Sequence, residues 1–336
     1  MRTIDFLEQG DGAITLIDQR LLPHEKKILT IKTHQELIEA IQTLAVRGAP
    51  ALGVAGALGV ALIALRSEQE KWSQEERNSA IAALRAARPT AVNLAWGVDQ
   101  VIPELVNGPS SVLKSALAIS RADGLANRAM GKLGAAYLLE KCGKKKLRIL
   151  THCNTGSLAT SDWGTALGVI RELSDQGYIE EVFADETRPL LQGSRLTAWE
   201  LSEAGIKYRI LPDGAAASAL FSGLIDAVLI GADRIARNGD SANKIGSLGV
   251  AVAAKESGIP FLVVAPESTI DRSLASGDEI EIEFRADSEV THFAGIAVAP
   301  LGSKSYNPAF DVTLARYITA IVTEKCVYQI SKGEAL

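Results

Sequence analysis

This sequence is poor in the residues that build disulfide scaffolds and zinc sites. It has three cysteines in 336 residues, Cys142, Cys153 and Cys326, and their spacing shows no pairing pattern. Its four histidines are scattered and form no zinc-ligand spacing with the cysteines. So few cysteines suit a reducing compartment better than a disulfide scaffold. We therefore expect a cytoplasmic protein without a metal.

The sequence also lacks an excess of positive charge, since its formal net charge is -5. This balance gives no general attraction to nucleic acid or anionic membranes, and neither is expected as a partner. The first residues lack the apolar core of a secretory signal. The segment Ala49–Leu65 is uncharged and mostly apolar, but it is short for a membrane span and rich in Ala and Gly. It predicts a helix packed closely against other backbone.

The common nucleotide-binding motifs are missing. No Gly-x-Gly-x-x-Gly follows the first strand of the predicted sheet, and no phosphate loop ends in Gly-Lys-Ser/Thr. These absences disfavour hydride transfer from a nicotinamide and phosphoryl transfer from ATP. We expect no cofactor, and any anionic ligand must be held by a local cluster of donors.

What the chain does have is a regular alternation of strand and helix patterns from Leu147 to about Val264. This predicts an α/β fold with a doubly wound parallel sheet. The preceding part reads as a smaller, mostly helical domain with short strands. We expect the domains to be residues 1–125 and 126–336, divided within a long helix at Ser111–Leu139. Further helices are predicted from Thr33 as N-cap, and at Pro50–Arg66, Gln74–Ala87, Ala91–Val106 and Thr313–Val322.

Polar clusters follow five predicted strands of the second domain. They are Thr151–Gly156, Asp185–Arg188, Pro212–Gly214, Gly231–Arg234 and Pro266–Thr269. In parallel sheets ligands bind beyond the carboxyl ends of the strands. The sequence therefore predicts an active site at that edge.

Cys153 and Asp233 are the candidate reactive groups at this edge. A helix after the Cys153 turn would favour the thiolate, although a buried, inert cysteine is the alternative. His152 would point away from Cys153 on an extended strand, which argues against a Cys–His pair. Asp233 follows a strongly apolar strand, where burial would suit a general acid. Its alternative role, capping the next helix, fits Asp240 better.

Two arginine-containing turns are candidate anion sites. In Arg47-Gly48-Ala49-Pro50, a helix start presents backbone N–H groups to a phosphate. The alternative is a helix start whose arginine pairs with a carboxylate. Arg88, before Pro89, is a similar but weaker candidate.

Other candidates lie in the second domain. Asn243-Lys244 is expected to open a helix and offer a cation and an amide. Asp185–Arg188 is expected to satisfy its own charges as an ion-pair loop, with Gln192 free to reach a sugar hydroxyl or phosphate.

Taken in order, these motifs resemble the methylthioribose-1-phosphate isomerase family, within the superfamily of the initiation factor 2B alpha, beta and delta subunits. The resemblance covers nearly the whole chain. It is carried by Val46–Ala51, Arg88–Asn93, Thr151–Asn154, Asp185–Gly193, Gly231–Ile235, Asn238–Asp240, Asn243–Gly246, Glu289–His292 and Asn307–Thr313.

The resemblance implies a Rossmann-like carboxyl-terminal domain, a cytoplasmic homodimer, and isomerisation of an aldose 1-phosphate in methionine salvage without metal or nucleotide. It assigns catalysis to Cys153 and Asp233. It assigns substrate contacts to Arg47, Gly48, Ala49, Arg88, Gln192, Asn243 and Lys244.

Three departures from the family pattern bear on the substrate: Gly214, Leu314 and Cys326 stand where methionine, proline and glycine are usual. Related isomerases of 5-deoxyribose 1-phosphate or ribose 1,5-bisphosphate share the scaffold and are alternatives. A non-catalytic regulatory subunit that binds a phosphorylated metabolite is the alternative of another class. Retention of both Cys153 and Asp233 counts against it.

Overall fold

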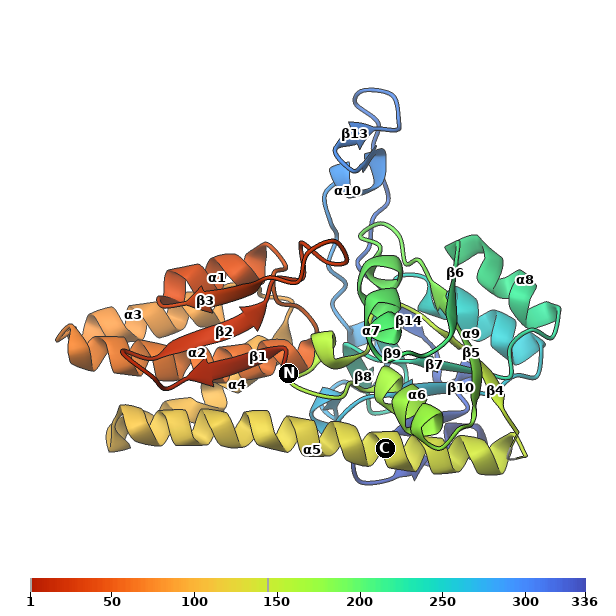
Figure 1. Ribbon diagram of the computed structural model, residues 1–336, viewed down its shortest axis with the longest axis horizontal. Coiled ribbons are helices and arrows are strands. Elements are labelled where there is room, and N and C mark those ends of the chain that lie inside the picture. Colours follow the sequence, from red (N-terminus) through yellow and green to blue (C-terminus); the bar gives the residue numbers. More distant parts are fainter. Residues whose placement is uncertain (1, 144) are drawn as a thin grey trace. The chain divides into compact units, whose positions relative to one another are not determined.

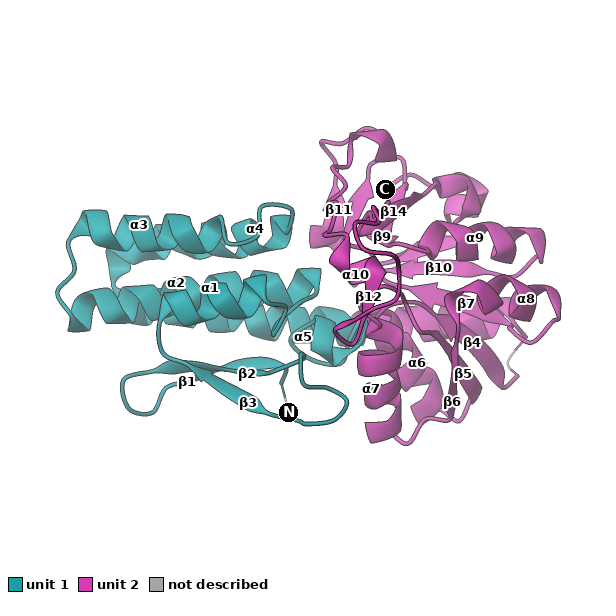
Figure 2. Cartoon of the chain, turned by 90° about the horizontal axis from the view of Figure 1, so that it is seen from above, with its two compact units in different colours: residues 1–128, 155–164 teal, residues 129–154, 165–336 magenta. Residues whose placement is uncertain are grey.

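The computed structural model describes residues 2–143 and 145–336, and the chain divides into two compact units (Figure 2). Unit 1 contains residues 1–128 and 155–164, and unit 2 contains residues 129–154 and 165–336. The long helix α5 (Pro109–Lys141) contributes residues to both. The predicted long helix at Ser111–Leu139 is confirmed.

Unit 1 combines a small sheet with helices (Figure 1). The sheet is antiparallel, in the order β1 (Ile4–Leu7), β2 (Ala13–Ile17) and β3 (Ile28–Ile31). The helices are α1 (His34–Gln42), α2 (Ala49–Gln69), α3 (Gln74–Arg85) and α4 (Val92–Val101). Thr33 caps α1 as predicted, since its side chain accepts a hydrogen bond from the Glu36 N–H.

Helix α2 is the core of unit 1. It is long and apolar enough to cross a membrane, yet 83% of its apolar window is buried. A Cβ placed on Gly97 of α4 would lie 1.9 Å from the backbone oxygen of Gly53 in α2. Only glycine permits so close an approach. The predicted close packing of this helix is confirmed, and the helix belongs to the core of a soluble protein.

Unit 2 is built on a seven-stranded sheet. Its order is β16 (Val327–Tyr328), β15 (Ala320–Val322), β10 (Phe261–Val264), β7 (Ala227–Ile230), β4 (Leu147–Thr151), β5 (Ile179–Asp185) and β6 (Tyr208–Leu211). All neighbours pair in parallel except β16, which is an antiparallel edge. The five strands predicted from the sequence are all present.

Helices cover both faces of this sheet. Ile149 of β4 packs in one cluster with residues of α5, α6 (Ala166–Asp175) and α7 (Ala198–Glu203). Leu150, the next residue, packs on the opposite face with residues of α8 (Ala216–Phe221) and α9 (Ser247–Glu256). This alternation follows from the two-residue period of a strand. The doubly wound α/β prediction is confirmed.

Two predicted helical segments are instead strands. Asn243 and Lys244 lie in β9 (Ser241–Lys244), which joins β8 (Arg234–Ala236), β11 (Ile270–Asp271) and β14 (Phe310–Thr313) in a small second sheet. The predicted helix at Thr313–Val322 is wrong, because Ala320–Val322 forms β15 and pairs with β10 in the buried sheet. In both segments long-range pairing overrides local propensity.

A hairpin finger, residues 288–306, projects from the rest of unit 2 (Figure 1). It contains α10 (Ser288–Thr291), β12 (His292–Phe293) and β13 (Ile296–Ala297). Several large apolar side chains here are exposed, including Ile296 at 70% and Leu301. Their exposure marks a surface suited to contact with another molecule.

Candidate active site

The polar clusters predicted at strand ends do meet at one edge of unit 2. His152 and Cys153 follow β4, Asp185 ends β5, Asp213 follows β6 and Asp233 follows β7. These strands are consecutive in the sheet, in the order β7, β4, β5 and β6. Parallel strands place their carboxyl ends together, so the topology gathers these side chains at one edge.

The Cys153 turn is held by hydroxyl groups. Cys153 is buried, with a φ of 62°, in the left-handed region. Its N–H donates to Thr187 Oγ1 at 2.9 Å, and its carbonyl accepts from Thr197 Oγ1 at 2.6 Å. Such a backbone costs roughly 1–3 kcal/mol in a residue with a Cβ and persists where neighbours over-determine it. The strain is an indication of function independent of the sequence motif.

The predicted helix dipole at Cys153 is wrong. Between Cys153 and α6, a stretch described throughout, the chain makes only a three-residue 3-10 turn at Ser157–Ala159. A regular helix begins only at Ala166. Hydroxyls and backbone groups, rather than a helix N-terminus, therefore surround the start of this turn.

His152 is fixed by two acceptors. Its Nδ1 lies 2.9 Å from Asp185 Oδ2, and its Nε2 lies 2.8 Å from the Ile245 carbonyl oxygen. Both side chains are about 1% exposed. Burial alone would lower the pKa of His152, but the hydrogen bond and charge of Asp185, with the Ile245 carbonyl, raise it above its ordinary value. With both nitrogens engaged, the ring is not the base of a Cys–His pair, as predicted.

The Asp185–Arg188 segment is not the self-contained ion-pair loop that the sequence suggests. Asp185 pairs with His152, while Arg188 donates to the backbone carbonyls of Pro189 and Val290. The carboxylate of Asp213 accepts from the N–H groups of Thr187 and Arg188, each at 2.7 Å. Asp213 therefore fixes the loop that supports Cys153.

His152, Asp185 and Asp213 also lie close enough to be considered as metal ligands, with one ligand atom of each within 4.8 Å of the others. Their chemistry argues for another role. Both His152 nitrogens face acceptors, and both Asp213 oxygens accept from backbone N–H groups. The cluster is a hydrogen-bond network rather than a fitting set of metal ligands.

A short hairpin carries three of the predicted site residues. The Asp233 N–H donates to the Ala242 carbonyl at 2.9 Å, which joins the end of β7 to β9. On β9, Asn243 Nδ2 donates to Ser247 Oγ at 2.8 Å, and Lys244 Nζ lies 4.7 Å from the Phe310 ring centroid. The structure thus brings Asp233 next to the strand of Asn243 and Lys244.

Asp240 does not cap the next helix. Its carboxylate accepts from the N–H groups of Gly277 and Ala315. Asp311 of β14 caps α9 instead, accepting from the N–H groups of Gly246 at 2.8 Å and Leu248 at 3.1 Å. This cap comes from a residue more than sixty positions away, so sequence reasoning missed it.

Gln192 lies buried beside the end of β5. A Cβ on Gly193 would lie 1.6 Å from the Asp185 backbone oxygen, so only glycine fits there. The following residues, Gly193–Thr197, form a π-helical turn, a feature frequent at functional sites. Gln192 is 5% exposed, and its Oε1 has no hydrogen-bond partner among the described residues. A buried acceptor left open is suited to a ligand hydroxyl.

In unit 1 the Arg47 turn depends on close backbone packing. Gly48 has φ 95° and ψ 135°, and a Cβ placed on it would lie 2.4 Å from the Ala159 oxygen. Ala49 begins α2, whose first N–H groups have no partner within the helix. A glycine is therefore required for Arg47 and the Ala49 N–H to take their positions.

Arg88 lies at the same end of the unit 1 helices. It occupies the turn between α3 and α4. A Cβ on Gly53, in the first turns of α2, would lie 3.3 Å from the Asn93 carbonyl at the start of α4. The starts of α2 and α4 are therefore in contact, and both arginine turns precede them.

The segment 155–164 is fastened within unit 1. Asp123 of α5 accepts from the Ser161 N–H at 2.8 Å and from Ser161 Oγ at 2.6 Å. The Arg128 guanidinium lies 4.3 Å from the Trp163 ring centroid. These contacts place Ala159 against Gly48.

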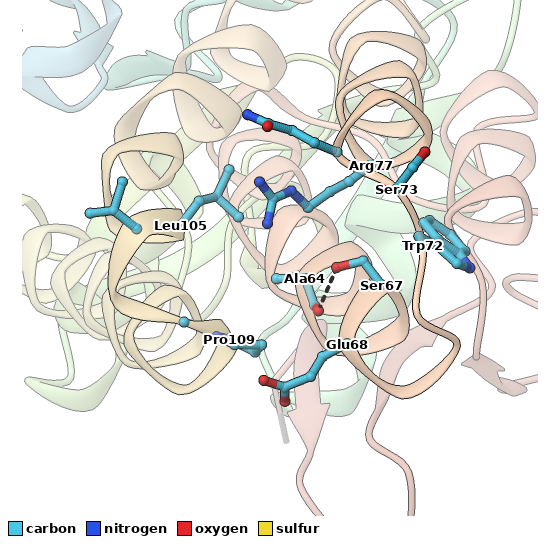
Figure 3. A pocket seen from close by; sticks show the side chains of 11 residues that line it. Ala64, Ser67, Glu68, Trp72, Ser73, Arg77, Leu105 and Pro109 are labelled. Carbon is cyan, nitrogen blue, oxygen red and sulfur yellow. Dashed lines mark hydrogen bonds between the residues drawn. The ribbon is translucent and has the colours of Figure 1, made fainter.

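A separate hollow of about 440 Å³ lies in unit 1, between the end of α2, the start of α3 and the residues before α5 (Figure 3). Arg77 points toward it beside Leu105, and Glu68 also lines it. None of the predicted site residues lines this hollow. This hollow is therefore separate from the strand-end cluster of unit 2 and from the arginine turns of unit 1.

A family comparison agrees with the motifs. Residues 45–329 match the initiation factor 2 subunit family. This chain is 53% identical, across 96% of its length, to a protein of Nocardia farcinica. That protein is named as a probable bifunctional methylthioribose-1-phosphate isomerase/methylthioribulose-1-phosphate dehydratase. The chain spans only 59% of that relative's length. The 5-deoxyribose 1-phosphate isomerase of Moorella thermoacetica is 48% identical, over 94% of this chain and 92% of that protein.

A solved structure extends this likeness to the fold. The crystal structure of 5-methylthioribose 1-phosphate isomerase from Pyrococcus horikoshii superposes with a TM-score of 0.88 and 41% identity. It matches 98% of this chain and 92% of the other. The resemblance inferred from the motifs is confirmed, and the chain belongs to the initiation factor 2 subunit family.

Proposed function

We propose that this protein is an aldose–ketose isomerase that converts 5-methylthioribose 1-phosphate to 5-methylthioribulose 1-phosphate in methionine salvage. One observation carries the proposal: Cys153, a thiol on a left-handed backbone, and Asp233, a carboxyl group, follow the adjacent strands β4 and β7. A binding protein has no need to hold a thiol in a left-handed turn with two hydroxyl supports.

The proposed chemistry must open a locked ring. Phosphate on the anomeric oxygen prevents the sugar from opening spontaneously. Asp233 donates a proton to the ring oxygen as the bond from that oxygen to C1 breaks. A hydrogen then moves from C2 to C1, and the C2 hydroxyl returns its proton to the Asp233 carboxylate as C2 becomes the ketone. Cys153 stabilises the transition state or relays a proton. Two routes fit this assignment: a proton transfer through a cis-phosphoenolate, and a direct hydride shift.

The proposed substrate contacts follow from the donors in each region. Arg47, Gly48 and Ala49, with Arg88, supply guanidinium and helix-start N–H groups for the phosphate. Gln192 offers its open Oε1 to a sugar hydroxyl. Asn243 and Lys244 supply an amide and a cation from β9. No metal or organic cofactor takes part in this scheme.

The proposed substrate and the alternative substrates differ in the group attached to C5 of the sugar. The relatives include isomerases named for 5-methylthioribose and for 5-deoxyribose 1-phosphate, and ribose 1,5-bisphosphate is a third candidate. Gly214 bears on this choice, because no described atom lies within 4 Å of a Cβ placed there. Where the family carries methionine, this chain leaves open space after β6.

Phosphorus NMR on the metal-free protein tests the function. The anomeric phosphate signal of 5-methylthioribose 1-phosphate should be replaced by that of a primary phosphate ester. The two alternative sugars are run in parallel, with Cys153→Ser as the inactive control. An unchanged spectrum for all three sugars, with folded protein, would refute the isomerase.

We further propose that the protein is a cytoplasmic homodimer. The exposed apolar side chains of the hairpin finger support self-association, since such groups are usually covered in a partner. Light scattering on the purified protein should give twice the chain mass, and Ile296→Asp should lower it. A monomer at micromolar concentration would contradict this.

A further inference from the structure

The turn that carries Cys153 is preceded by a buried histidine to which no step of the proposed reaction gives a role. We propose that His152 is a positioning residue that works as an imidazolium cation, with one N–H holding the end of β5 and the other holding the segment after β9. The proposal rests on the proposed function, because the segments that it joins carry Cys153 on one side and Asn243 and Lys244 on the other.

Counting protons limits the states of the ring. The carbonyl of Ile245 can only accept, so Nε2 must carry a proton to make its 2.8 Å hydrogen bond. The contact of 2.9 Å between Nδ1 and Asp185 Oδ2 then needs one more proton, on one of the two atoms. A proton on Nδ1 gives an imidazolium beside a carboxylate. A proton on Asp185 gives two neutral groups.

The surroundings favour the charged ring. The charged groups that act on it from neighbouring elements are carboxylates: Asp185 at the end of β5, Asp213 after β6, and Asp311 of β14. A neutral ring would leave the carboxylate of Asp185, which is 1% exposed, without a cation in contact with it. Burial raises the pKa of Asp185 and so favours the neutral pair, but three carboxylates acting on one buried ring stabilise its positive form.

The ring also fixes the bend after β9. Gly246 has a φ of 107°, and a Cβ placed there would lie 2.8 Å from His152 Cε1. The Gly246 N–H donates to Asp311, and the carbonyl of Ile245 accepts from the ring. His152 therefore packs against this bend and bonds to it, directly after Asn243 and Lys244. Releasing the ring would let these two residues shift relative to Cys153.

Nitrogen NMR tests the charge without any need for activity. The protein is labelled with 15N-histidine, and the ring signals of His152 are identified by their loss in His152→Asn. Both ring nitrogens of His152 should show the protonated pattern of an imidazolium at pH 7.5. A neutral pattern for His152 in the folded protein would overturn the proposal, whatever the enzyme's substrate.

Kinetics test the positioning role separately. His152→Gln retains a donor that can reach the Ile245 carbonyl, and His152→Asn retains one for Asp185, but neither joins both. Both should lower kcat/KM by about 10- to 100-fold, the usual effect of losing an orienting partner. KM should rise as well as kcat fall, because Lys244 moves. His24→Asn is the matched control and should keep full activity. Turnover of both folded variants within about twofold of wild type would refute the role.

Discussion

At the carboxyl edge of the unit 2 sheet, side chains hold the Cys153 turn, whereas in unit 1 backbone packed on backbone holds the Arg47 turn. Cys153 is flanked by the hydroxyls of Thr187 and Thr197. Gly48 instead lies against the main chain of Ala159. The Cys153 turn can be weakened by removing single hydrogen bonds, whereas the Arg47 turn should be disrupted as soon as a Cβ is added at Gly48. The proposed catalytic turn and the proposed anion-binding turn are thus held in place by different physical means.

The largest effect is expected from removing the acid at the unit 2 edge. Asp233→Asn keeps the shape but cannot donate a proton to the ring oxygen. Turnover should fall by about 10³- to 10⁴-fold, the upper part of the range for general acid catalysis. Initial rates by phosphorus NMR, with circular dichroism to verify folding, measure it. Near-normal turnover in the folded variant would remove Asp233 from the mechanism.

In unit 1, adding a single methyl group at Gly48 should disrupt the packing that holds the Arg47 turn. Gly48→Ala forces a Cβ against Ala159 and an alanine into a glycine-only conformation. We expect a loss of about 2–4 kcal/mol in the free energy of unfolding, from overpacking and backbone strain together. KM should rise at least tenfold. Urea unfolding and kinetics measure the two effects.

Gly10→Ala is the matched control for that substitution. Gly10 also has a positive φ, 67°, but no described atom lies within 4 Å of a Cβ placed there. Only backbone strain should appear, about 1–2 kcal/mol, with unchanged KM. If the two variants lose equal stability, close packing at Gly48 contributes nothing.

A smaller effect should come from one hydroxyl at the unit 2 edge. Thr187→Val removes the acceptor of the Cys153 N–H and leaves that buried donor unpaired. The cost should be about 1–3 kcal/mol in stability, with turnover reduced about tenfold as the turn relaxes. Thr30→Val on the exposed face of β3 is the control. An unaffected turnover would mean that Thr187 is not needed to hold Cys153.

The sequence predicted the strand-end cluster because that prediction needs only local patterns. Apolar strands followed by polar turns mark the edge of a parallel sheet whatever their distant partners are. Cys153, Asp185 and Asp233 were therefore found as strand-end residues. The supports of Cys153 were not, because Thr187 and Thr197 reach it from more than thirty positions away.

Long-range pairing also explains the wrong predictions. Asn243-Lys244 precedes a helix in sequence, but its pairing with β14 makes it a strand. The cap of that helix comes from Asp311, on the same distant strand. Asp185 pairs with His152 rather than with nearby Arg188, since buried partners are chosen by the fold. Local motifs indicate which residues are reactive, but not what holds them.

The smallest effect is expected at the opposite edge of the same sheet. Asp226 precedes β7 at its amino end and accepts from Arg148 and Lys145. Burial opposes ionisation, but these hydrogen bonds hold the pKa of Asp226 at about 2, below the ordinary 3.8. Because the pKa of Asp226 is lower in the folded protein than in the unfolded chain, its ionised carboxylate stabilises the fold above about pH 4. This stabilisation is lost as the pH falls toward 2.

Asp226→Asn should therefore lower the free energy of unfolding by about 1–2 kcal/mol at pH 6. This value allows for the solvent exposure of Lys145 and Arg148, which weakens both ion pairs. The difference from wild type in urea unfolding should shrink between pH 4 and pH 2. Asp99→Asn, which breaks an exposed pair with Arg85, should cost only a few tenths of a kcal/mol. Turnover should stay unchanged in both, because neither residue lies at the carboxyl edge of the sheet. A large loss of turnover in Asp226→Asn, with the fold intact, would show that the two edges are not independent.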